Sequence, residues 1–356
     1  MRADRDRLRE IVGGVPDPEI GRPLDDLGML DDVRVDRRGH AQVSVALTTQ
    51  GCPLADALRE SVVAAATGVD GVRSVDVTFT VMDERRRAAV GRRLREARTP
   101  LNGPLGGGPR VYAVASGKGG VGKSTVTANL AVALAAQGQR VAVLDADVWG
   151  YSMPLLFGVR RAPIAFDGVM LPVPAHGVAL MSIGFFVTDE QPVVWRGPML
   201  HKALEQFCAD VYWGEPDVLL VDLPPGTGDV TLSVLQLLPD ASLVVVTTPQ
   251  RAASSVASRV GRLARDSGMP IAGVVENMSG PVFGTGGGAA LAEELGTTSL
   301  GVLPLAPEVR EAGDRGVPVV LDFPDSAAAA ELRRMAAALP APRRALLRRP
   351  LPLHVS

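Results

Sequence analysis

The segment Gly117–Thr125, with the sequence GKGGVGKST, has the residue types and spacing of a loop that binds phosphate groups. Its four glycines allow successive backbone N–H groups to surround an anion. Lys123 can reach the β- and γ-phosphates of a nucleoside triphosphate, and the Ser124 hydroxyl is placed to ligate Mg²⁺. The predicted nucleotide-binding residues are Gly117, Lys118, Gly119, Gly120, Val121, Gly122, Lys123, Ser124 and Thr125.

The residues around this loop predict the structural context that a phosphate site requires. The apolar run Val111–Ala115 reads as a buried strand, and residues 123–137 carry the pattern of a helix. A strand that enters the loop and a helix that leaves it would point the positive end of the helix dipole at the phosphates. We therefore expect the chain to bind a nucleoside triphosphate.

Carboxylates follow two other predicted strands. Asp222 ends the apolar run that begins at Val218, and a carboxylate at that place reaches the Mg²⁺ shell, usually through water. Asp145 and Asp147 come directly after the strand pattern that begins at Arg140. Phosphoryl transfer needs an oriented water more than a strong base, and an aspartate at this strand end could hold that water. Asp145 could orient the loop or serve only as a structural residue.

A second group of residues could form the site for the base. Asn277 follows the predicted strand Ile271–Val275, where an amide side chain can read the edge of adenine. Pro304, in the segment Leu303–Pro307, would provide the opposite wall. Asn277 could equally be an ordinary turn residue.

The chain has two cysteines, Cys52 and Cys208, and their spacing excludes a disulfide framework or a close metal-binding pair. We expect Pro53 to open a helix that runs through Ala66, which would place Cys52 at a helix start that favours a thiolate. Cys52 could therefore be a thiol ligand, or only a small packed residue. Cys208 lies within a helical pattern and is expected in the core.

Alternating strand and helix patterns after residue 110 predict the fold class. The apolar runs near 218–222, 242–248, 271–275 and 300–303 are too continuous for half-exposed strands. Such runs are typical of a parallel sheet covered on both faces. We expect an α/β domain with a doubly wound, mostly parallel sheet over residues 110–340, and ligands at the carboxyl ends of its strands.

The rest of the chain divides around that domain. Residues 1–98 read as a small α+β module that ends in an arginine-rich helix, which could be a solvated face, a bridge between domains or a site for an acidic partner. Residues 99–109 form a Pro/Gly linker, and residues 341–356 form a basic tail.

Composition narrows the function further. The formal net charge of −2 argues against a general nucleic-acid binder. The sequence contains no apolar run of about 18 residues, so no membrane span is expected. The charged start of the chain lacks the apolar core of a signal peptide. We therefore expect a cytoplasmic protein.

Together these segments resemble the Mrp/ApbC-type iron–sulfur cluster carrier ATPases, with a small iron–sulfur-assembly module ahead of the ATPase domain. The resemblance is carried by GKGGVGKST, VLDADVWGYSMP, VDLPPGTGD and GVVENMSG. Lys118 resembles the signature lysine of the "deviant Walker A" ATPases, which implies a homodimer in which this lysine contacts the partner's phosphates. The alternative is a solvated loop lysine. The resemblance to the same ATPases implies that Asp147 holds the attacking water.

The resemblance also implies that the protein binds clusters and transfers them to apoproteins or exchanges them with assembly factors. One feature departs from the family: the C-x-x-C pair that commonly follows ENMS is absent, because Ser279 leads through Gly280–Gly284 into a glycine-rich loop. Four thiolates from the usual positions cannot form in a dimer. The alternative function is a positioning, partition or regulatory dimeric ATPase without cluster chemistry.

Overall fold

The computed structural model describes residues 4–97, 108–187 and 197–340, and it divides the chain into two compact units. The basic tail and all but the last two residues of the Pro/Gly linker lie outside the described residues. The first unit comprises residues up to 98 together with Ile164–Pro172, and the second comprises the remainder. The inclusion of residues 164–172 in the first unit is not apparent from the order of elements along the sequence.

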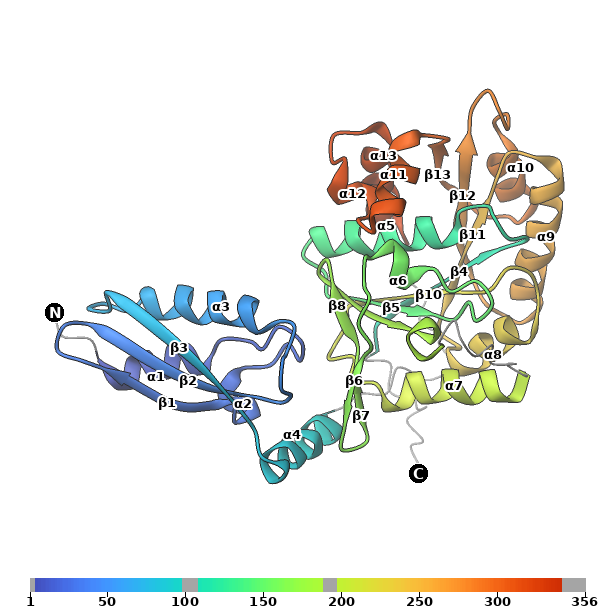
Figure 1. Cartoon of the computed structure of the whole chain (residues 1–356). Helices are drawn as coiled ribbons and strands as arrows, with labels where there is room; N and C mark the ends of the chain where they lie inside the picture. Colours follow the sequence, from blue (N-terminus) through green and yellow to red (C-terminus); the bar gives the residue numbers. More distant parts are fainter. Residues whose placement is uncertain (1–3, 98–107, 188–196, 341–356) are drawn as a thin grey trace, which may run out of the picture. The chain divides into compact units, whose positions relative to one another are not determined.

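The first unit is built on a three-stranded sheet in the order β1-β2-β3 (Figure 1). Strand β1 (Leu30–Val35) pairs antiparallel with β2 (His40–Leu47), which pairs parallel with β3 (Ser74–Val81). Helix α1 (Arg5–Gly13) packs on β1 and on α3 (Ala55–Thr67), and the short helix α2 is Leu24–Leu27. Apolar side chains fill the space between them, among them Leu8, Val12, Val33, Val45, Leu58 and Val62.

The predicted start of α3 was wrong. The helix begins at Ala55, because Pro53 and Leu54 form a turn in which the Ala55 N–H donates to the Cys52 carbonyl oxygen (3.1 Å). Cys52 therefore lies three residues ahead of the helix. Because the electrostatic effect of a helix end falls off within a turn, Cys52 is less favoured as a thiolate than the sequence indicated.

The arginine-rich helix α4 (Glu84–Ala97) belongs to the first unit and uses some of its arginines for packing. Arg86 donates to the Gly28 carbonyl oxygen (2.7 Å), and Arg93 donates to that of Asp26 (2.8 Å). Arg95 pairs with Asp167 at 2.7 Å, in the turn of the hairpin formed by β6 (Ile164–Phe166) and β7 (Val169–Leu171). These arginines of α4 therefore pack against the rest of the first unit, and the helix is more than a solvated face.

The second unit contains an eight-stranded sheet in the order β13-β12-β11-β4-β10-β5-β9-β8. Its bounds are β4 Arg110–Ser116, β5 Val141–Asp145, β8 Val173–Ala175, β9 Val178–Ser182, β10 Val218–Asp222, β11 Ser242–Thr247, β12 Ile271–Ser279 and β13 Ser299–Pro304. All neighbours pair in parallel except β8 and β9. The α/β class with a mostly parallel sheet, preceded by a small α+β domain, is confirmed.

Helices cover both faces of this sheet, with α5 above the central strands and α7 and α8 below them in Figure 1. Their bounds are α5 Lys123–Ala136, α6 Met153–Leu156, α7 Gly197–Asp210, α8 Asp229–Leu237, α9 Arg251–Asp266, α10 Gly287–Glu294, α11 Pro307–Arg315, α12 Val319–Asp322 and α13 Ala327–Ala338. Helix α5 has apolar residues all round and is buried between the sheet and α13. Within the described ranges, no helix is long and apolar enough to cross a membrane.

The two hairpins between residues 164 and 182 were not predicted. Each has a two-residue turn with positive φ at both positions, Asp167-Gly168 (51° and 75°) and His176-Gly177 (50° and 78°). An Asp-Gly pair between apolar residues is a strong hairpin signal, because these residues tolerate the left-handed backbone that tight turns need. The sequence therefore contained a signal for the first hairpin.

Candidate functional site

The phosphate-binding loop lies between β4 and α5, as predicted, and its backbone shape depends on glycine at two positions. A Cβ atom on Gly117 would come within 2.2 Å of the Ala257 backbone nitrogen, since α9 packs directly on the loop. Gly122 has φ +81°, and a Cβ atom there would lie 2.2 Å from the Asn277 side-chain nitrogen. Larger residues at either position would displace the loop.

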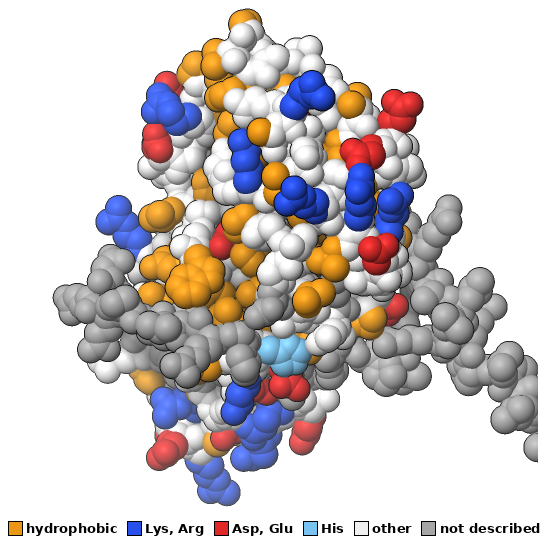
Figure 2. All heavy atoms as spheres, turned by 90° about the vertical axis from the view of Figure 1, so that its right-hand side faces the viewer, with side chains coloured by type: hydrophobic (Ala, Val, Ile, Leu, Met, Phe, Trp, Pro, Cys, Tyr) orange, Lys and Arg blue, Asp and Glu red, His pale blue; other side chains and the backbone are white. Residues whose placement is uncertain are grey.

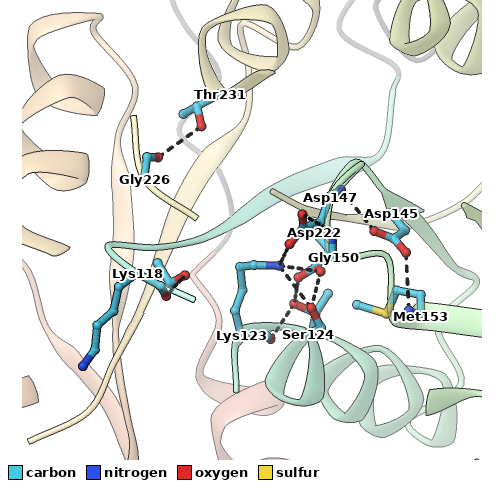
Figure 3. Close-up of polar contacts among 12 residues, drawn as sticks. Lys118, Lys123, Ser124, Asp145, Asp147, Gly150, Met153, Asp222, Gly226 and Thr231 are labelled. Atoms are coloured by element: carbon cyan, nitrogen blue, oxygen red, sulfur yellow. Dashed lines mark hydrogen bonds and ion pairs between the residues drawn. The ribbon is translucent and has the colours of Figure 1, made fainter. Parts of the chain in front are cut away.

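The sheet order brings Lys123, Ser124 and Asp222 together (Figure 3). Strands β4 and β10 are neighbours, so the carboxyl end of β10 places Asp222 beside the first turn of α5. Asp222 Oδ2 accepts hydrogen bonds from Lys123 Nζ and Ser124 Oγ, each at 2.6 Å. Asp222 is fully buried, Lys123 is 6% exposed and Ser124 is half-buried, so the ion pair in this polar cluster is largely shielded from water.

Asp147 lies at the edge of the same cluster. Its Oδ2 is 3.5 Å from Lys123 Nζ, and its Oδ1 accepts the Gly150 N–H (3.1 Å). Burial raises the pKa of Asp147, while the positive charge of Lys123 lowers it in part. The side chain is thus held by the loop that follows β5, with one carboxylate oxygen toward the lysine that the phosphates would contact.

Asp145 is fully buried and organises that loop. Its carboxylate accepts hydrogen bonds from the Asp147 N–H (3.1 Å), the Met153 N–H (3.3 Å) and the Ser182 hydroxyl (2.8 Å). Burial, and secondly the nearby charge of Asp222, raise the pKa of Asp145 to about 7. These contacts match a loop-orienting role better than direct contact with a nucleotide.

The electrostatic balance of the cluster calls for additional cations when phosphates bind. Asp145, Asp147 and Asp222 are three carboxylates around the buried Lys123. ATP would bring further negative charge into a region from which water is largely excluded. A hydroxyl and a carboxylate oxygen, from Ser124 and Asp222, lie side by side there, and oxygen ligands of this kind suit Mg²⁺. The residues present therefore fit a magnesium ion.

Lys118 and Asn277 occupy different surroundings. Lys118 is exposed and points away from the Lys123 cluster in Figure 3. Asn277 is 6% exposed, lies within β12 rather than after it, and donates from Nδ2 to the Val121 carbonyl oxygen (2.9 Å). In this structure Asn277 is a brace for the phosphate-binding loop. Pro304 is the last residue of β13 and is exposed.

The sequence did not identify Thr127 or Glu276 as part of this region. Thr127 Oγ1 lies 2.7 Å from Asp222 Oδ1. The carboxylate of Glu276, which is fully buried, accepts the N–H groups of Gly286 (3.1 Å) and Gly288 (2.6 Å) at the start of α10. A charged residue directly after the apolar run Ile271–Val275 was a usable signal for Glu276, whereas a threonine inside a helix gives none.

The two cysteines lie in unrelated places. Cys208 is 2% exposed on α7, and burial, followed by the charge of Glu205, raises the pKa of its thiol to about 12. Its predicted place in the core is confirmed, and a thiol of this kind is a poor metal ligand. Cys52 is partly exposed in the loop before α3. Within the described ranges, no cluster of three or more His, Cys, Asp or Glu side chains could hold a metal ion.

The loop after β12, where the resemblance implied a cysteine pair, is short and closed. Gly280 and Gly284 exchange two backbone hydrogen bonds, at 2.9 and 2.7 Å, directly after β12. The side chain of Val282, at the tip, is 73% exposed. The turn therefore has no sulfur ligand and returns the chain at once to the glycine-rich start of α10.

The fold and this site define the chain as a P-loop NTPase of the ParA type. A family model for the NUBPL iron-transfer P-loop NTPases matches residues 109–340, and one for an iron–sulfur cluster assembly protein matches residues 5–79. The chain belongs to the family of iron–sulfur cluster carrier proteins.

Similar proteins include the iron–sulfur cluster carrier proteins of Mycobacterium tuberculosis and Bacillus subtilis. The first is 48% identical, with 95% of this chain and 94% of the relative aligned, and the second is 40% identical, with 84% and 88% aligned. Among solved structures, a nucleotide-binding protein from Archaeoglobus fulgidus in complex with ADP is 33% identical. It matches with a TM-score of 0.53 over 64% of this chain and 92% of its own length.

Proposed function

We propose that this protein is a magnesium-dependent ATPase that acts as a homodimer and delivers iron–sulfur clusters to apoproteins. The observation that supports it most directly is the buried cluster of Lys123, Ser124 and Asp222 beside a glycine-shaped loop. The kinship with iron–sulfur cluster carriers supports the cluster as cargo. ATP hydrolysis by the purified protein, assayed with Mg²⁺ and with a chelator, tests the central claim.

In this proposal Lys123 leaves its carboxylate partners to bind the β- and γ-phosphates. Ser124 would ligate Mg²⁺ directly, and Asp222 would hold it through water. The ion would neutralise charge that develops on the phosphate oxygens during transfer. Asp147 orients the attacking water, and its low exposure and fixed loop keep the carboxylate in one orientation. Asp145 positions this loop from beneath.

The base is proposed to lie between the segments of Asn277 and Pro304. Asn277 donates one N–H to Val121, which leaves its second N–H for a ligand. The structure therefore supports a second task for the same amide, which is to fix the phosphate-binding loop. Because Asn277 would contact both the base and the phosphate-binding loop, a bound base would affect the conformation of that loop.

Lys118 is proposed to act across a dimer interface, because it is exposed and directed away from its own Lys123 cluster. We expect both Lys118→Ala and Asp147→Asn to be poor ATPases as pure homodimers. When the two are mixed, a heterodimer has one site with an intact Asp147 and the partner's intact Lys118. Activity should rise to about a quarter of the wild-type rate, since half of the dimers are mixed and each has one competent site.

The measurement is steady-state phosphate release before and after subunit exchange. Two differently tagged variants, co-purified through one tag after mixing, provide the control for exchange itself. If Lys118 acts within its own subunit, neither site of the mixed dimer is complete, and activity that stays at the level of the pure variants contradicts the role across the interface.

Because the C-x-x-C pair is absent, this chain would have to bind a cluster through other ligands. A dimer offers two copies of Cys52 and two of the buried Cys208, whereas clusters are held by four ligands. We propose that Cys52 supplies one thiolate per subunit and that a client, an assembly factor or a small thiol completes the set. The partly exposed loop before α3 is accessible to such a partner.

Cys52→Ser is expected to abolish cluster transfer to an apoprotein while leaving ATP hydrolysis unchanged. Cys208→Ala is the control, because that thiol is buried with a raised pKa and should not take part. The measurements are iron content and the visible spectrum after anaerobic reconstitution with iron and sulfide, and the activity of the acceptor. Isolated wild-type protein should hold less than one cluster per dimer. A stable stoichiometric cluster that survives Cys52→Ser would overturn this assignment.

A positioning or partition ATPase is the alternative function, and the charge pattern of the face shown in Figure 2 does not favour it. Such a protein would need a broad basic face for nucleic acid or an apolar helix face for a membrane. On the face shown in Figure 2, basic and acidic side chains are interspersed. Arg262 of α9, for example, pairs with Glu294 of α10 at 2.6 Å. Mixed charge of this kind is typical of a solvated protein surface.

A further inference from the structure

Thr127 is a fully buried hydroxyl at the metal side of the site with no role assigned above. It lies on α5, four residues after Lys123, so the two side chains share one face of the helix. Its Oγ1 is 2.7 Å from Asp222 Oδ1 and 3.0 Å from the Lys123 carbonyl oxygen. Asp222 is 95 residues away in the sequence, and only the adjacency of β4 and β10 brings it there.

A buried threonine in a helix often donates to the carbonyl four residues earlier, which is a local structural contact. That habit explains the 3.0 Å contact to Lys123 but not the shorter one to Asp222. Since a hydroxyl has a single hydrogen, it favours the charged and closer acceptor. Thr127 is therefore best understood as a donor to Asp222.

The two oxygens of Asp222 have different partners. Oδ2 accepts from Lys123 and Ser124, and Oδ1 accepts from Thr127. In the proposed function, Lys123 turns to the phosphates and Ser124 turns to the metal ion. Among the donors that the structure gives to this carboxylate in the described ranges, Thr127 is the side chain that has no other task. It can remain bonded in every nucleotide state.

Without such a donor the carboxylate could turn about its terminal torsion, which is soft in aspartate. Burial makes the loss serious, because Asp222 is fully buried and water cannot readily replace the hydroxyl. Residues that orient metal-binding groups from outside the coordination shell matter nearly as much as the ligands. We propose that Thr127 is a positioning residue that holds Asp222 toward the magnesium ion and thereby sets the magnesium dependence of nucleotide binding.

This inference rests on the proposed magnesium site, and binding can test it without turnover. Thr127→Val removes the hydroxyl and keeps the shape of the side chain, whereas Thr127→Ser keeps the hydroxyl. Binding of a fluorescent ATP analogue is titrated at increasing Mg²⁺ and again in a chelator. Thr127→Val should raise the half-saturating Mg²⁺ concentration by about 10- to 100-fold, and Thr127→Ser should stay within about threefold of wild type.

Affinity in the chelator should be the same, within about twofold, for all three proteins, since the contacts described for the Thr127 hydroxyl are to Asp222 Oδ1 and the Lys123 carbonyl oxygen, and both are acceptors that do not bind phosphate. A merely structural role would instead lower the unfolding temperature of Thr127→Val and leave the magnesium dependence unchanged, which would overturn the inference. Should Thr127→Val fail to fold, Thr127→Ala provides the same comparison with a smaller side chain. If wild-type protein binds nucleotide without any magnesium dependence, the proposed metal site itself is refuted. If wild-type binding depends on magnesium and Thr127→Val shows the same dependence, only the role of Thr127 is refuted.

Discussion

Replacing Lys123 by alanine is expected to weaken ATP binding by about two orders of magnitude or more and to abolish hydrolysis. Lys123 is the cation buried between Asp147 and Asp222, at 3.5 and 2.6 Å. Without it, two buried carboxylates would face the incoming phosphates with no protein charge to offset them. Isothermal titration with ATP in the presence of Mg²⁺ measures the loss, and phosphate release measures the turnover.

The same loop supplies a matched control. Lys118 is five positions earlier, carries the same charge and is exposed, so Lys118→Ala should retain nucleotide binding by the isolated subunit. The unfolding temperature of both variants must be compared, because removal of one partner from a buried ion pair also costs stability. A folded Lys123→Ala protein with near-normal ATP affinity would refute the phosphate-loop assignment.

The second large effect is expected for Asp147→Asn, which should lower ATP turnover at least about 100-fold with nucleotide affinity nearly unchanged. Asparagine retains an oxygen for the Gly150 N–H, so the loop can keep its shape. What it loses is the negative charge that, in the proposed function, orients the attacking water. Single-turnover hydrolysis, measured with all ATP bound to an excess of protein, separates this chemical step from binding.

Asp145→Asn is the informative comparison, because Asp145 is buried beneath the same loop and contacts backbone groups rather than solvent. Its effect on turnover should be smaller and should accompany a change in stability. Equal turnover in wild-type and Asp147→Asn protein would favour the regulatory alternative, in which ATP closes a dimer and hydrolysis is incidental.

The phosphate-binding loop and the fold class could be predicted because their information is local. Residues 117–125 are contiguous, so covalent geometry alone keeps the glycines, lysine and serine together. The apolar runs and helical patterns after residue 110 likewise indicate, from the local sequence alone, which residues are buried. The core position of Cys208 followed from the same periodicity, and it is 2% exposed.

Errors and omissions occurred where geometry depends on a neighbour. The start of α3 was misplaced by two residues, because Pro53 is as compatible with a turn as with a first helical position. The brace from Asn277 to Val121 joins residues 156 positions apart and was not predicted, since Asn277 was interpreted as a base contact or an ordinary turn residue. The hairpin at residues 164–172 joins the first unit through its contact with α4, which strand order cannot reveal.

The sequence by itself determined that this chain has a phosphate-binding loop, an α/β sheet to present it and no cysteine pair after ENMS. Tertiary structure decided which carboxylate oxygen of Asp222 faces which donor, with Oδ1 accepting a hydrogen bond from the buried Thr127. The physical reason is that a loop motif is encoded by adjacent residues. The site around Asp222 instead depends on the order β5-β10-β4, which brings together side chains about a hundred residues apart in the chain.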